Sequence, residues 1–87
     1  MNAKVLGHVG AKLTGFRPTD RGTPVDLFVV RANPARTGDG VFVGVEIAGL
    51  GLVEGRLETV RDENGVGHVE FVDIETNRII IYAASVP

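Results

Sequence analysis

Residues 52–73 carry the pattern that decides the fold, and they read LVEGRLETVRDENGVGHVEFVD. Two runs of alternating apolar and polar residues flank a short polar stretch that ends at Gly65. Alternation with a period of two is typical of β-strands that bury one face, and a short loop containing glycine joins two such strands into a hairpin. These residues therefore predict a β-hairpin.

The register of this hairpin follows from its apolar side chains. A two-residue loop would place Glu58 opposite Phe71, which buries a carboxylate or exposes an aromatic ring. A three-residue loop over 63–65 pairs Leu57 with Phe71 and gives Gly65 the positive φ of a type I turn with a G1 bulge. We therefore expect the three-residue loop. The outer face then carries Arg56, Glu58, Val60, His68, Glu70 and Val72.

Short runs rich in Val, Ile, Phe and Thr recur along the rest of the chain, between stretches that contain Gly, Pro, Asn and Asp. Because no window shows the 3.6-residue period of an amphipathic helix, we expect an all-β chain. The region 15–24, which has two Pro and two Gly, is expected to be a loop. The remaining strands are predicted over 4–14, 25–32, 41–48 and 78–84.

The predicted strands differ in how they alternate. Every second residue from Val41 to Ile47 is Val or Ile, which predicts one buried face. The centres of 25–32 and 78–84 are apolar on both faces, so each strand should be internal or covered by a partner, because an exposed edge of that kind pairs with other chains. In the N-terminal run, the alternation predicts that one face of the strand carries Val5, Val9, Ala11 and Leu13.

Length and composition set the size of the fold. The chain has 87 residues, 44% of them hydrophobic, and a net charge of −2, which predicts one folded domain over 1–87. Within it, 1–24 form an N-terminal strand and loop, or an arm that exchanges with a neighbour. Six short strands predict a small antiparallel β-sandwich of six to seven strands, with a small β-barrel as the alternative.

Three segments share a pattern of turns and core positions. They are a Pro-containing strand with a Gly-Asp turn over 32–43, a hairpin over 59–71 and a closing strand over 79–84. Together they resemble bacterial immunoglobulin-like domains of the invasin/intimin type, although Gly67 stands where that family usually has alanine. The resemblance implies an immunoglobulin-like sandwich with a structural or adhesive role, and it does not extend to 1–24.

No catalytic arrangement is recognisable in the sequence. The chain has no Cys, and its single Ser, Ser85, lies outside any nucleophile motif. His8 and His68 lack a metal-binding spacing, and the glycines in 49–55 lack the helix that a phosphate loop needs. The polar turn 62–64 lacks EF-hand spacing, although a calcium site built from several loops is an alternative. We therefore expect no enzyme, no catalytic residue, no metal and no cofactor.

Charge is distributed unevenly along the chain. Residues 1–40 hold six cations and three anions, whereas 41–87 hold three cations and eight anions. A basic surface that meets an acidic one favours association between copies or with a protein partner. The acidic balance disfavours nucleic acid, and no apolar run is long enough to cross a membrane. The candidate partner-binding residues are Arg17, Arg21, Arg36, Ile80 and Tyr82.

Together these observations predict a non-enzymatic structural or binding module that assembles with a protein partner or with copies of itself. The biological role expected for such a module is that of a virion accessory protein, such as a capsid decoration protein, or that of an assembly subunit. The alternative is a small β-barrel that binds nucleic acid or forms a ring. The first residues lack the apolar stretch of a secretion signal, which predicts a cytoplasmic or virion location.

Overall fold

The computed structural model of the protein describes residues 3–61, 63–65, 67–76 and 78–85, apart from the side chains of Arg21, Ile79 and residues 82–85. Over these ranges the chain forms one short helix and six strands. They are α1 (Ala3–Leu6), β1 (Lys12–Arg17), β2 (Asp20–Pro34), β3 (Val41–Ile47), β4 (Gly51–Arg61), β5 (Gly67–Asp73) and β6 (Ile79–Ser85). None of the described helical residues belongs to a helix with the length and hydrophobicity that crossing a membrane requires.

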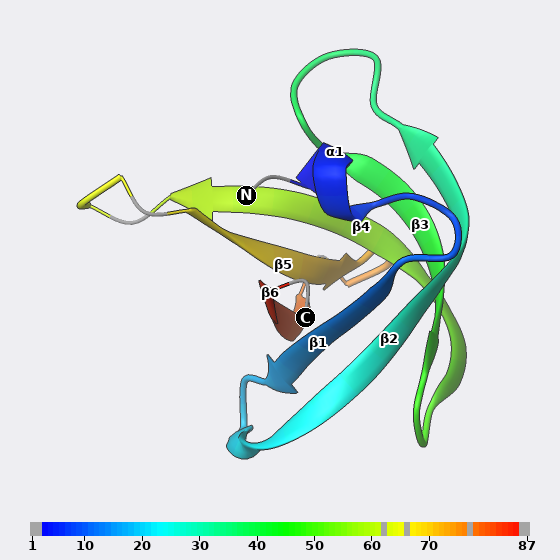
Figure 1. The fold of residues 1–87 in the computed structure, drawn as a ribbon, viewed down its shortest axis with the longest axis vertical. Coiled ribbons are helices and arrows are strands. Elements are labelled where there is room, and N and C mark those ends of the chain that lie inside the picture. The colour runs from blue at the N-terminus through cyan, green and yellow to red at the C-terminus, as the bar shows by residue number, and fades with distance from the viewer. Residues whose placement is uncertain (1–2, 62, 66, 77, 86–87) are drawn as a thin grey trace.

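The strands form one antiparallel sheet that closes into a barrel in the order β1-β2-β3-β4-β5-β6 (Figure 1). Each strand pairs with its neighbours in the chain, and β1 pairs with β6 to complete the ring. The predicted small all-β fold is confirmed. Of the two expected architectures, the closed sheet corresponds to the small β-barrel, since a sandwich is built from two separate sheets packed face to face.

The hairpin of β4 and β5 has the predicted register. Leu57 lies opposite Phe71, and both side chains are fully buried. Gly65 has a φ of 78°, as the predicted turn requires. The two residues that flank the expected three-residue loop, 62 and 66, lie outside the described residues. The apolar alternation of the two strands was therefore sufficient to select their pairing.

The N-terminal segment differs from the strand expected over 4–14. One helical turn, α1, takes the place of its first half, and β1 begins later. Ala3 and Leu6 are buried, whereas Val5 and Val9 are 60% and 63% exposed. Residues three apart share one side of a helical turn, so the buried pair has a spacing that a strand would divide between two faces.

The predicted loop over 15–24 is also different, because β1 and β2 continue through most of it as a hairpin. Phe16 pairs with Pro24 across the two strands. At this point β3 does not extend alongside β2, since their pairing begins only at Leu27 opposite Ile47. Proline has no backbone N–H to donate. A strand tolerates proline where the edge that would need this donor has no neighbouring strand.

The core is a single apolar cluster inside the barrel, to which every strand and α1 contribute. The alternation predicted for β3 is confirmed, because its four Val and Ile residues are buried. Among the described residues no polar or charged residue is buried. The polar side chains that could recognise a ligand therefore lie on the outer surface of the described chain.

α1 packs against the barrel beside β4 and adds its buried residues to the core (Figure 1). The backbone N–H of Ala3 donates a hydrogen bond to Thr59 Oγ1 on β4, at 2.8 Å. Gly7, which follows α1, lies close to Val41, so that a Cβ there would be 3.1 Å from the valine side chain. The helical turn is thus fixed by contacts with residues far away in the sequence.

We expect Thr59→Val to lower the free energy of unfolding by about 1 to 2 kcal/mol. Valine preserves the shape of threonine but removes the hydrogen-bond acceptor for the N–H of Ala3, a buried residue. Urea denaturation followed by circular dichroism measures the change. Thr37→Val, at an exposed position between β2 and β3, is the matched control and should change little. Equal stability of the two variants would contradict the role of this hydrogen bond.

Candidate interaction surface

Exposed apolar side chains gather on the outer surface of β2, β3 and β4. On these strands four large apolar side chains are between 38% and 54% exposed, namely Phe28, Val30, Phe42 and Leu52. Single exposed apolar residues are common in proteins, whereas a contiguous group is associated with binding. We call this surface the β2–β4 face. It comprises Phe28, Val30, Arg31, Asn33, Phe42, Gly44, Glu46, Leu52, Glu54 and Arg56.

The strand register arranges this face in three rows that run across the sheet. In each row, one residue from β2, one from β3 and one from β4 are paired with one another. The rows consist of Phe28, Glu46 and Leu52, then Arg31, Gly44 and Glu54, then Asn33, Phe42 and Arg56. Val30 is an additional residue of β2 at the register shift between Val29 and Arg31.

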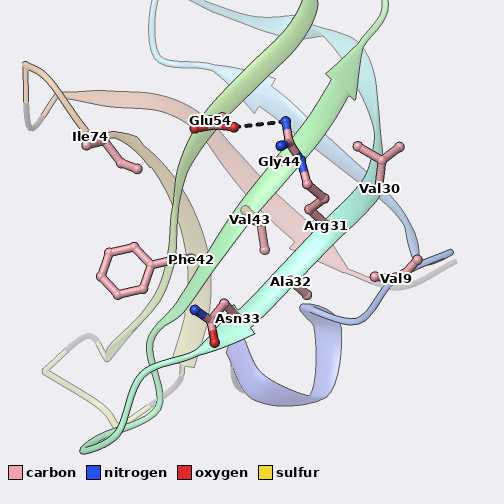
Figure 2. A pocket seen from close by; sticks show the side chains of 10 residues that line it. All are labelled: Val9, Val30, Arg31, Ala32, Asn33, Phe42, Val43, Gly44, Glu54 and Ile74. Carbon is pink, nitrogen blue, oxygen red and sulfur yellow. Dashed lines mark ion pairs between the residues drawn. The ribbon is translucent and has the colours of Figure 1, made fainter.

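An ion pair crosses the middle row (Figure 2). Arg31 Nη2 lies 2.9 Å from Glu54 Oε1, and the two side chains are 62% and 60% exposed. Gly44 lies between them on β3, and a Cβ at that position would be only 3.2 Å from Arg31 Nε. The glycine therefore allows the arginine side chain to lie flat across β3. The centre of the β2–β4 face carries a positive group over β2 and a negative group over β4.

A shallow hollow of about 440 Å³ surrounds this ion pair. Figure 2 shows Phe42 and Ile74 on one side of the hollow, and Val30 and Val9 on the other. Its walls are thus mainly apolar, while its middle holds the two charges. Such a surface can accept an apolar side chain of another molecule next to a polar contact, and arginine is among the residues enriched at protein–protein interfaces.

The row nearest the turn between β3 and β4 contains an aromatic ring that already contacts a cation. Lys12 Nζ lies 5.6 Å from the ring centroid of Phe28 and 3.7 Å from Asp26 Oδ2. The lysine charge is therefore shared between the ring and a carboxylate. Glu46 is the neighbour of Phe28 on β3 and is exposed.

A second group of charged side chains lies on β4 and β5. Arg56 Nε is 2.6 Å from Glu58 Oε1, and His68 Nε2 is 3.0 Å from Glu70 Oε2. Glu58 and Glu70 face each other across the two strands, and each has its partner on its own strand. Among the described residues no group of three or more His, Cys, Asp or Glu side chains is arranged to hold a metal ion.

The partner-binding residues predicted from the sequence are not gathered at one place. Arg17 is half-buried next to the turn between β1 and β2, whereas Arg36 is exposed between β2 and β3, beyond the opposite end of β2. Ile80 on β6 is partly buried and packs against the core. Arg21 and Tyr82 lie on β2 and β6, and their side chains are outside the described set.

Sequence reasoning found part of the β2–β4 face and missed the rest. The run 25–32 is apolar on both faces, which indicated a surface in need of a cover, and it contains Phe28 and Val30. Phe42 gave no separate signal, because an aromatic residue on the polar face of a strand is common. Arg31 and Glu54 are far apart in the chain, and only the register of β2, β3 and β4 places them on either side of Gly44.

The segments that resemble immunoglobulin-like domains fall on β2 and β3, on the β4–β5 hairpin and on β6. In this structure they belong to one closed sheet. The resemblance to the invasin/intimin type stays a prediction from the sequence. No protein-family model, curated protein or solved structure with which the chain was compared matches it.

Proposed function

We propose that this protein is a non-enzymatic binding module that assembles with a protein partner through the β2–β4 face. The observation that carries the proposal is the group of exposed aromatic and aliphatic side chains around the ion pair of Arg31 and Glu54. Binding energy at protein interfaces is concentrated in aromatic and arginine side chains near the centre of the contact. The face offers Phe28, Phe42 and Arg31 for that role.

The shape of the surface supports a protein partner more than a small ligand. Small molecules bind in concave pockets that cover most of their surface, whereas the hollow around the ion pair is shallow and open. The described core side chains are apolar and packed together, so a partner would bind on the outside of the barrel.

Nucleic acid is the alternative partner, and the contact of Lys12 with Phe28 is the feature that would favour it. Single strands bind where aromatic rings stack on bases and cations contact phosphates. Here Lys12 also pairs with Asp26, and Glu46 is the neighbour of Phe28 on β3. Carboxylates repel phosphates, so we expect no shift of single-stranded DNA in a gel at low salt, where phosphate contacts are strongest.

Site-specific photo-crosslinking tests the proposal. In cells that produce the full chain, a benzophenone side chain in place of Phe42 should form adducts of defined mass with a protein. The same group in place of Glu63, which is exposed between β4 and β5, is the control and should not form them. Absence of adducts at position 42, or equal yields at the two positions, would remove the proposal.

Mass spectrometry of the adduct identifies the partner. A capsid or other particle protein in the adduct would support the virion accessory role expected from the sequence, and the protein should then sediment together with those particles. A second copy of the chain in the adduct would support an assembly subunit.

A further inference from the structure

We propose that the partner of the β2–β4 face is a second copy of this chain, related to the first by a twofold axis that runs along β3 above Gly44. This inference rests on the proposed function and names the partner. Two copies would meet face to face, and every contact between different residues would occur twice.

The positions of the two central charges support this axis. Arg31 lies on β2 and Glu54 lies on β4, so they are one strand away from β3 on opposite sides. Rotation by 180° about an axis along β3 places β2 of one copy over β4 of the other. Arg31 of each copy then faces Glu54 of the second copy, and the pair within each chain becomes a ring of four alternating charges.

The same rotation keeps each row of the face opposite itself, and the apolar residues then match. Phe28 lies over Leu52 of the second copy in one row, and Phe42 lies over Phe42 of the second copy in another. These side chains are all partly exposed in the single chain. Aromatic pairs add to the burial of apolar surface and so favour association.

Charge complementarity favours this axis over one that runs across the strands. A twofold axis across the strands would place Arg31 against Arg31 and Glu54 against Glu54 of the second copy, which is repulsive at both positions. With the axis along β3, the single repulsive contact within the β2–β4 face is Glu46 against Glu46 of the second copy. We therefore expect Glu46→Gln to strengthen association roughly tenfold, because it removes this repulsion without changing the shape of the side chain.

Charge reversal of the central pair tests the inference. Sedimentation velocity of the purified full chain, from about 1 μM to about 1 mM, should show a dimer whose dissociation constant rises roughly 100-fold in Arg31→Glu and in Glu54→Arg. A mixture of these two variants should form a dimer as tight as the unsubstituted protein. In the mixture, each introduced carboxylate faces an introduced guanidinium on the other chain.

Controls separate association from folding. Arg31 and Glu54 are both well exposed, so at a protein concentration low enough for the chain to be monomeric their substitution should leave thermal unfolding nearly unchanged, as circular dichroism can verify. Arg61→Glu makes the same change in net charge as Arg31→Glu, at an exposed position near the far end of β4, and should leave the dimer intact.

Three outcomes would overturn the inference. They are a monomer over the whole concentration range, no recovery in the mixture of Arg31→Glu with Glu54→Arg, and a weaker dimer in Glu46→Gln. If the purified protein is monomeric while cross-links at position 42 capture a different protein, the inference fails and the proposed function stands. If neither dimer nor cross-link is found, both fail.

Discussion

Replacement of Phe71 by alanine is expected to lower the free energy of unfolding by about 3 to 5 kcal/mol. Among the described residues, Phe71 has the largest fully buried side chain, and it lies opposite Leu57 at the pairing of β4 with β5. Alanine would leave a cavity that the surrounding strands cannot close, because their hydrogen bonds hold the barrel together. A domain of this length has a total stability of about 4 to 13 kcal/mol, so the substitution should remove a substantial fraction of the total.

Guanidinium denaturation followed by circular dichroism measures this change. Phe42→Ala is the matched control, because it removes the same ring from an exposed position on β3. At a protein concentration low enough for the chain to be monomeric, the control should alter stability by about 1 kcal/mol or less. If the two variants lost equal stability, Phe71 would not hold the central position in the core that the structure gives it.

Substitution of Gly55 by alanine is expected to cost about 3 kcal/mol, because β4 has no space for a side chain at that position. A Cβ there would lie 2.6 Å from Cε1 and 2.7 Å from Cζ of Phe71, and it would also meet the carbonyl oxygen of Val72. The ring is confined by the core and the carbonyl belongs to a strand, so neither can move away easily.

The control for this substitution is Gly40→Ala, where the nearest heavy atom is 3.8 Å from the added Cβ. Its effect on the midpoint of denaturation should be small. The combination of Gly55→Ala with Phe71→Leu should lose less stability than the sum of the single changes, because leucine lacks the ring atoms that clash. Additive losses would show that the two residues do not share this space.

The central hairpin was predictable because its determinants are local. The apolar alternation on β4 and β5 leaves one pairing that keeps Glu58 outside and Phe71 inside, and Gly65 supplies the conformation of the turn. The one-sided burial of β3 was predictable for the same reason. In both cases the period of the side chains and the face that must be buried agree.

The N-terminal turn could not be predicted in the same way. A single helical turn is too short to show a period, and its burial depends on Thr59, which is 56 positions away from Ala3. The closure of the sheet is also non-local, because it depends on the pairing of β1 with β6. A sandwich and a barrel of short strands have the same local alternation, so the sequence left both architectures open.

The β2–β4 face was only half predictable. The double-sided apolar pattern of β2 indicated a covered surface, and Phe28 and Val30 lie on it. The pairing of Arg31 with Glu54 required the registers of two successive strand pairs and the absence of a side chain at Gly44. The arginines chosen from the sequence were selected for charge alone, and charge does not determine which end of the barrel a loop occupies.

The closure of the ring has a consequence for how the chain reaches its native state. Five of the six pairings join strands that are successive in the chain, and these can form soon after each segment is available. The pairing of β1 with β6 joins the first and the last strand of the barrel and has the largest entropic cost of loop closure, so it should form last. Until then both outer strands have unpaired edges, and during biosynthesis this interval is when the chain is most exposed to wrong pairing with other nascent chains.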